Sequence, residues 1–208
     1  MTNLSHKPTL EGSRVTLRPV AADDAPTFAR ILCDPDVVRL TGSANESASD
    51  EEPPLQTLVD WYGTRSDQSD RLDLAVVDNA TGVVVGEVVL NHWDPGSRGI
   101  SYRTLIGPQG RDRGFGTEAT RLIVGYAFEQ LRLHRVELEV FAFNGRARRV
   151  YEKVGFVVEG TRRDALYFDG LWVDSHIMAM LEQEWAQHRG TPETSGAGRW
   201  EDEPRQAP

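Results

Sequence analysis

The most constraining feature of this sequence is a change of hydrophobic period on either side of one glycine-rich basic loop. Residues 100–106 (ISYRTLI) alternate in the manner of a β-strand, whereas residues 116–131 place apolar side chains on one face of a helix. The loop GPQGRDRGFG, residues 107–116, lies between them. A long helix after such a strand predicts a crossover between strands that lie parallel in one sheet.

The spacing of apolar residues along the rest of the chain predicts an α+β fold. Short turns join most of the expected strands, which indicates antiparallel pairing. The predicted order is β-α-α-β-β-β-α-β-α-β-β, arranged as a twisted mixed sheet. Strands are expected at 14–18, 72–78, 83–91, 100–106, 135–143, 156–167 and 171–181, and helices from Asp23 or Asp24 to about Pro35 and at 55–62, 116–131 and 145–154.

The 208 residues are enough for one buried core, and we expect a single domain over 1–190. The acidic segment 41–54 has no periodicity and reads as a mobile loop. Residues 191–208 are rich in Gly, Pro, Glu, Ser and Thr, which predicts a flexible C-terminal tail.

Composition narrows the classes of protein that fit. The single cysteine, Cys33, excludes an internal disulfide framework and favours a reducing compartment. No apolar run is long enough to cross a bilayer and no signal peptide is evident, so we expect a cytoplasmic protein without a membrane partner. A net charge of −9 argues against a nucleic-acid partner, and the five scattered histidines suggest no metal site.

The basic loop has the chemistry of an anion-binding cradle. Gly114 and Gly116 allow a ligand to approach the backbone, and Arg111 and Arg113 supply positive charge. Amides at a helix start have no intrahelical partner, and the helix dipole adds positive character there. A pyrophosphate is the ligand that such a loop fits best.

Two other interpretations of this loop remain open from the residues alone. A short GxG stretch is most often an ordinary solvated loop. Gly114-Phe115-Gly116 with Ala119 also matches a dinucleotide-binding fingerprint, with Glu137 at roughly the spacing of its acidic residue. That fingerprint follows its strand directly, however, whereas the polar residues 107–113 intervene here.

A second motif points to a family. Arg111-x-x-Gly114-x-Gly116 resembles the acyl-CoA-binding motif of the GNAT N-acetyltransferase superfamily, and NGRARRVYEKVGF (144–156) resembles that family's second signature. The resemblance covers about residues 12–182 and is strongest to the RimJ/RimL-like branch. It implies a GNAT-like sheet that is splayed at the acyl-CoA site, with acetyl-CoA as acyl donor and no metal. The residues it implies for coenzyme binding are Thr104, Leu105, Ile106, Arg111, Arg113, Gly114, Phe115, Gly116, Thr117 and Asn144.

The resemblance also implies catalytic residues. Tyr151 is the expected general acid for the leaving thiolate, because a phenol and a thiol have similar basicity. Glu139 is the expected base for the attacking amine, and Glu87 is a weaker candidate. Each has a structural alternative: Tyr151 lies on the apolar face of its helix, and both glutamates could be ordinary solvated or ion-paired residues.

The expected activity is direct acetyl transfer to a primary amine, foremost the α-amine of a protein or peptide. A small amine such as a polyamine, amino acid or aminoglycoside, and a succinyl-CoA donor, remain alternatives. A coenzyme A-binding module without catalysis is the non-enzymatic alternative. A homodimer is an alternative to a monomer.

Overall fold

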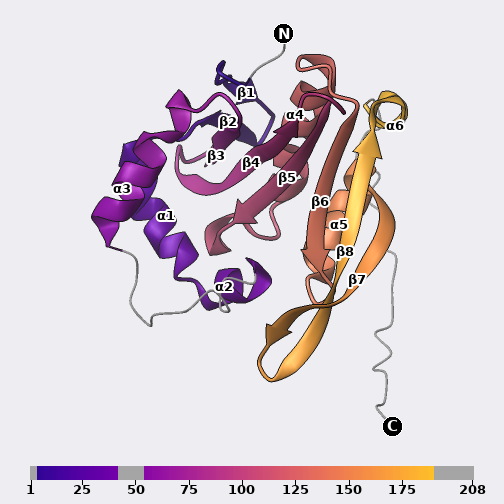
Figure 1. The fold of residues 1–208 in the computed structure, drawn as a ribbon. Helices are drawn as coiled ribbons and strands as arrows, with labels where there is room; N and C mark the ends of the chain where they lie inside the picture. The colour runs from indigo at the N-terminus through magenta and orange to yellow at the C-terminus, as the bar shows by residue number, and fades with distance from the viewer. Residues whose placement is uncertain (1–3, 42–53, 190–208) are drawn as a thin grey trace.

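Eight strands form one mixed sheet in the computed structural model, which describes residues 4–41 and 54–189 (Figure 1). The strand order across the sheet is β1-β2-β3-β4-β5-β6-β8-β7. Their bounds are β1 Leu10–Glu11, β2 Val15–Pro19, β3 Leu72–Asp78, β4 Val84–Asp94, β5 Gly99–Ile106, β6 Arg135–Phe141, β7 Val157–Phe168 and β8 Leu171–Leu181. The predictions for the 41–54 loop and the 191–208 tail fall, but for Thr41 and Pro54, outside the described residues.

Helices cover both faces of the sheet. The longer ones are α1 Ala25–Leu32, α2 Pro35–Thr41, α3 Leu55–Gly63, α4 Phe115–Glu129, α5 Gly145–Val154 and α6 Glu182–His188. One core cluster joins α4, α5 and Trp185 of α6 to one face, with Ile123 and Val136 fully buried. A second cluster joins α1, α2 and α3 to the other face, around Phe28 and Ala75. Figure 1 shows α1, α2 and α3 grouped on one side of the strands.

The only parallel pair among these strands, β5 with β6, is held together over three residues. Gly99, Ile100 and Ser101 pair with Arg135, Val136 and Glu137. Beyond Ser101 the two strands have no shared register, although β5 stays paired with β4 as far as Ile106. The expected splay of the sheet is therefore present, and it exposes one edge of β5 from Tyr102 onward.

Alternation on β6 agrees with the sequence pattern. Val136, Leu138 and Val140 are buried against the α4 and α5 layer, whereas Glu137 and Glu139 lie on the opposite face. The antiparallel pairing of β6 with β8 along its whole length keeps this orientation fixed.

Three of the strands and longer helices given above were not predicted. Pro35 ends one predicted helix but also begins α2. Proline is well accommodated at a first helical position, and Asp34 Oδ1 accepts a hydrogen bond from the Val37 amide at 3.0 Å. The two residues of β1 are too few to show a period. Helix α6 directly continues β8, and Trp185 anchors it on α4 by packing against Phe128.

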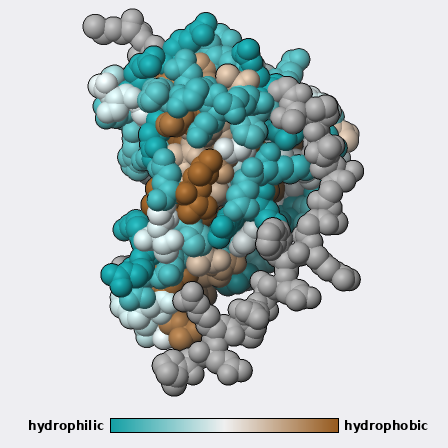
Figure 2. Space-filling model, turned by 90° about the vertical axis from the view of Figure 1, so that its right-hand side faces the viewer, coloured by the Kyte–Doolittle hydropathy of each residue, from teal (hydrophilic) through white to brown (hydrophobic). Residues whose placement is uncertain are grey.

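The β7–β8 side of the molecule is mostly hydrophilic, with separate small hydrophobic areas (Figure 2). Its largest exposed apolar side chains are Leu171 and Trp172, which are 70% and 63% exposed. These separate apolar side chains do not test whether the protein forms a homodimer, which stays a prediction. Within the described residues, no helix combines the length and apolar character needed to cross a membrane.

Candidate active site

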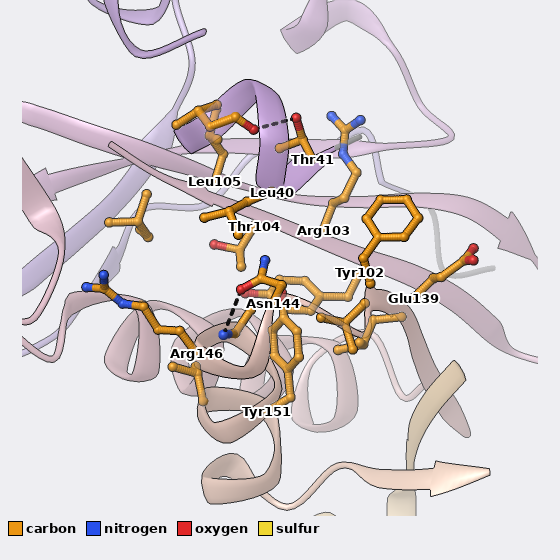
Figure 3. A pocket seen from close by; sticks show the side chains of 18 of the residues that line it. Leu40, Thr41, Tyr102, Arg103, Thr104, Leu105, Glu139, Asn144, Arg146 and Tyr151 are labelled. Carbon is orange, nitrogen blue, oxygen red and sulfur yellow. Dashed lines mark hydrogen bonds between the residues drawn. The ribbon is translucent and has the colours of Figure 1, made fainter. Parts of the chain in front are cut away.

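A cavity of about 1080 Å³ opens where β5 and β6 separate. It is bounded by the splayed part of β5, by β6, by the glycine-rich loop, and by α2 and α5. Figure 3 shows Leu40 and Thr41 on one side of β5, with Asn144 and Tyr151 on the other. The predicted site residues that line it are Thr104, Leu105, Ile106, Arg111, Gly114, Phe115, Gly116, Thr117, Glu139, Asn144 and Tyr151.

Close packing holds the loop between β5 and α4 in one conformation. Gly114 caps α4 in the left-handed conformation (φ 78°), and a Cβ there would lie 2.3 Å from Arg14 Nη1. At Gly110 a Cβ would lie 2.8 Å from Ile106 Cγ2. The Glu118 amide donates a hydrogen bond to the Gly114 carbonyl at the start of α4. The backbone amides that come before Glu118 in the first turn have no helical carbonyl one turn earlier to which they could donate. The loop therefore presents fixed backbone donors.

The two loop arginines are held by carboxylates. Arg111 donates to Asp34 at 2.7 Å and to Asp36 at 3.1 Å, which ties the loop to the α1–α2 junction. Arg113 donates to Asp78 at 3.0 Å and stacks over Phe115. Arg111 still lines the cavity, whereas Arg113, a predicted site residue, is not among the residues that line it.

Tyr151 lies on the cavity side of α5. The Asn144 side chain caps this helix by accepting from the Ala147 amide at 3.1 Å, and Gly155 ends it in the left-handed conformation, as the sequence predicts. The Tyr151 ring is 6% exposed and packs edge-on against Phe156. Burial raises the pKa of Tyr151, so its hydroxyl remains protonated.

Glu139 is tied into an ion pair. Arg162 Nη1 donates to both of its carboxylate oxygens at 2.8 Å, and Ser175 Oγ donates a short hydrogen bond to one of them. Three donated hydrogen bonds therefore already occupy the Glu139 carboxylate.

Glu87 is the residue that the sequence predicts as the weaker of the two candidate bases. It lines the same cavity from β4 but is only 7% exposed. Burial raises the pKa of Glu87 to about 6, although the hydrogen bond with the Tyr62 hydroxyl lowers this pKa. Arg103 Nη2 lies 3.8 Å from its carboxylate. No sequence signal separates it from a surface glutamate, because its burial depends on α3.

The charges around the cavity are balanced. Five carboxylates line it, and each has an arginine within 4.0 Å: Asp36, Glu87, Asp112, Glu137 and Glu139. The described residues contain no group of three His, Cys, Asp or Glu side chains placed to hold a metal ion. A fixed set of backbone donors, a protonated phenol and a buried carboxyl are the groups that acyl transfer uses.

Comparison with known families decides the assignment. The model of the acetyltransferase (GNAT) domain matches residues 14–157, more than half of the chain. The chain belongs to the GNAT acetyltransferase family. The match runs from β2 into β7 and thus includes the strands and the loop that border the cavity at the β5–β6 gap.

Curated GNAT relatives and solved structures differ in their named acceptors. Over 104 residues the chain is 34% identical to YdaF of Bacillus subtilis, provisionally named a ribosomal N-acetyltransferase; this spans 50% of the chain and 57% of YdaF. It is 28% identical to the spermidine N(1)-acetyltransferase of Escherichia coli (strain K12), over 68% of the chain and 76% of that enzyme. A crystal structure of the spermidine N-acetyltransferase from Vibrio cholerae with CoA and spermine has a TM-score of 0.72 and 22% identity, covering 84% of this chain and 99% of that one. This last similarity supports the fold.

Proposed function

We propose that this protein transfers an acetyl group from acetyl-CoA to the α-amine of a protein or peptide, by direct attack in a ternary complex. The observation that carries this proposal is the loss of pairing between β5 and β6 beyond Ser101. The gap is lined from one sheet face by Leu40 and Arg103 and from the other by Asn144 and Tyr151. A donor and an acceptor can therefore meet there from opposite faces, which is the geometry that direct transfer requires.

On the donor side, the fixed amides at the start of α4 would bind the pyrophosphate of the coenzyme. Arg111 and Arg113 would add to the positive potential while staying paired with their carboxylates. The exposed edge of β5 at Thr104 to Ile106 would bind the pantetheine arm, with Asn144 on the far side of the gap. Tyr151 would donate its proton to the leaving thiolate.

On the acceptor side, the charge balance favours a peptide over a polyamine. A polyamine carries several cationic groups and needs carboxylates that are free to receive them. Four of the five lining carboxylates have an arginine within 3.1 Å, and only Glu87 has its arginine farther away, at 3.8 Å. Six cationic side chains line the same cavity: Arg39, Arg103, Arg111, Arg146, Arg149 and Lys153. The name of the ribosomal relative YdaF agrees with a protein acceptor and with the RimJ/RimL-like branch that we propose. The spermidine enzymes among the relatives keep a polyamine as the second candidate.

Direct transfer is favoured over an acyl-cysteine intermediate. Cys33, the single cysteine, follows α1 and is not among the residues that line the cavity. The attacking nitrogen would form its bond to the thioester carbon while the C–S bond breaks, and no covalent enzyme intermediate is needed.

The test has two stages. Thermal unfolding is first measured with acetyl-CoA, succinyl-CoA, free coenzyme A, NAD and ATP, because a ligand that binds the folded state raises its stability. We expect stabilisation by the coenzyme A species alone. Release of free thiol from acetyl-CoA is then followed with a peptide that has a free α-amine, the same peptide with a blocked α-amine and one lysine, and spermidine.

We expect turnover with the free α-amine peptide only. Turnover with spermidine alone would show that the acceptor is a polyamine and not a peptide. Faster turnover with succinyl-CoA than with acetyl-CoA would show that the acyl donor is succinyl-CoA. Binding of acetyl-CoA without turnover on any acceptor would leave a coenzyme-binding module, and stabilisation by NAD alone would contradict the proposal.

A further inference from the structure

We propose that Glu87, and not Glu139, accepts the proton of the attacking ammonium. This inference rests on the proposed acetyl transfer and assigns the general base within it. The carboxylate of Glu139 already accepts hydrogen bonds from Arg162 and Ser175.

Strand pairing places Glu87 beside the segment proposed to bind the pantetheine arm. Its Cα is paired with that of Leu105 on β5, and directly opposite side chains in an antiparallel pair lie on one face, about 5 Å apart at Cβ. Glu87 is thus next to the exposed part of β5, and it lines the cavity that the gap opens.

The acid and the base would approach the gap from opposite faces of the sheet. Tyr151 belongs to the core cluster of α4 and α5. Leu105 and Tyr62, the neighbours of Glu87, belong to the cluster of α1 and α3. An amine that enters past α2 would meet Glu87 first, whereas a thiolate leaving toward α4 would meet Tyr151.

The carboxyl of Glu87 is suited to exchange a proton near neutral pH. Burial raises its pKa to about 6, so it is ionised at pH 7 and yet more basic than an exposed glutamate. Charged and titratable groups face it from every neighbouring element: Tyr62 on α3, Arg65 after α3, Arg71 and Asp73 on or beside β3, and Arg103 on β5. Arg103 is 3.8 Å away and 65% exposed, which leaves its side chain room to move when a substrate enters.

The proton balance of the step is complete. The Glu87 carboxylate takes one proton from the ammonium, and the freed amine attacks the thioester carbon. The new C–N bond forms as the C–S bond breaks, a second nitrogen proton is released to solvent, and the Tyr151 hydroxyl protonates the thiolate. The Tyr151 phenolate then recovers a proton from solvent, and Glu87 loses its own.

The experiment is a pH profile of kcat/KM between pH 5 and 9 for the wild type, Glu87→Gln and the matched control Glu139→Gln. Two acceptors with different amine pKa values are used. A limb of the pH profile whose midpoint changes with the acceptor reports the pKa of the amine. A limb whose midpoint is the same for both acceptors reports a group of the enzyme. Acetyl-CoA affinity by calorimetry verifies that each variant is folded and binds the donor. In the free protein, the carboxyl carbon of Glu87 is titrated by NMR.

We expect an enzyme limb near pH 6 that is present in the wild type and in Glu139→Gln and absent in Glu87→Gln. Glu87→Gln should lose at least ~100-fold in kcat/KM, and Glu139→Gln only a few-fold. Tyr62→Phe should move the limb to higher pH, because the hydroxyl stabilises the ionised form. The NMR titration should give the same midpoint as the limb.

Two results would overturn the assignment in an active enzyme. One is a Glu87→Gln variant that keeps its rate and its limb, and the other is loss of the limb in Glu139→Gln. A wild type that binds acetyl-CoA but acetylates no amine would instead overturn the proposed function, and the role of Glu87 with it.

Discussion

The rings of Tyr102 and Tyr151 meet edge-on, with 6.2 Å between their centroids, but their hydroxyl groups have different surroundings. The Tyr102 hydroxyl bonds Thr120 Oγ1 at 2.9 Å, and Thr120 in turn donates to the Gly116 carbonyl. Both residues border the cavity. The Tyr102 hydroxyl connects β5 to the start of α4 through this hydrogen bond, whereas the Tyr151 hydroxyl is the one that we propose as the general acid.

This pair gives a matched test of the general acid. We expect Tyr151→Phe to lose ~100-fold or more in turnover, with its stability within about 1 kcal/mol of the wild type, because only a hydroxyl is removed. Tyr102→Phe should show the opposite pattern. It should lose about 1 kcal/mol of stability with its buried hydrogen bond and keep most of its activity. Thiol release and urea unfolding measure both, and full activity in Tyr151→Phe would remove it as the acid.

The buried carboxyl of Glu87 makes stability depend on pH. Its folded-state pKa, about 6, lies above the ordinary value of 4.5. The favourable contribution of the protonated form is therefore complete below about pH 4.5 and is lost as the pH rises through 6. Glu87→Gln should gain stability relative to the wild type above pH 6, on the order of 2 kcal/mol, and nothing at pH 4. Urea unfolding across this range tests it, and a gain that does not vary with pH would contradict the pKa shift.

Gly86 is expected to be essential for the shape of the gap. A Cβ at this position would lie 2.1 Å from the Leu105 carbonyl oxygen, which is backbone and cannot turn aside. Gly86→Ala should destabilise the protein by roughly 1–3 kcal/mol and weaken acetyl-CoA binding by displacing β5. Gly99→Ala, on the same strand pair but with no heavy atom within 4 Å of the new Cβ, is the control. Equal unfolding midpoints for the two variants would refute this expectation.

Asn144 is expected to have two separable roles. Asn144→Ala should lose about 1 kcal/mol of stability with the cap of α5, whereas Asn144→Asp should keep it, because a carboxylate caps a helix as well. Both substitutions remove the amide donor, so both should weaken acetyl-CoA binding in calorimetry. Wild-type affinity in the stable Asn144→Asp variant would reduce Asn144 to a cap alone.

Local patterns were sufficient for most of the fold. Alternation predicted β6 and the orientation of Val136, Leu138 and Val140, and the Asn144 and Gly155 signals predicted both ends of α5. These features depend on the residues of one segment. The start of α2 at Pro35 was missed because proline both ends one helix and begins the next.

The sequence by itself determined the loop and helix that we propose to bind a pyrophosphate, and the tyrosine that faces the same gap, because both are encoded within short segments. Only the tertiary structure decided the state of the charged groups. Arg111 reaches Asp34 across 77 positions of the chain, and Glu139 reaches Ser175 across 36. Glu87 is buried because α3 places Tyr62 over it. Ionisation depends on such distant neighbours and on exclusion of water, and neither is written in the spacing of nearby residues.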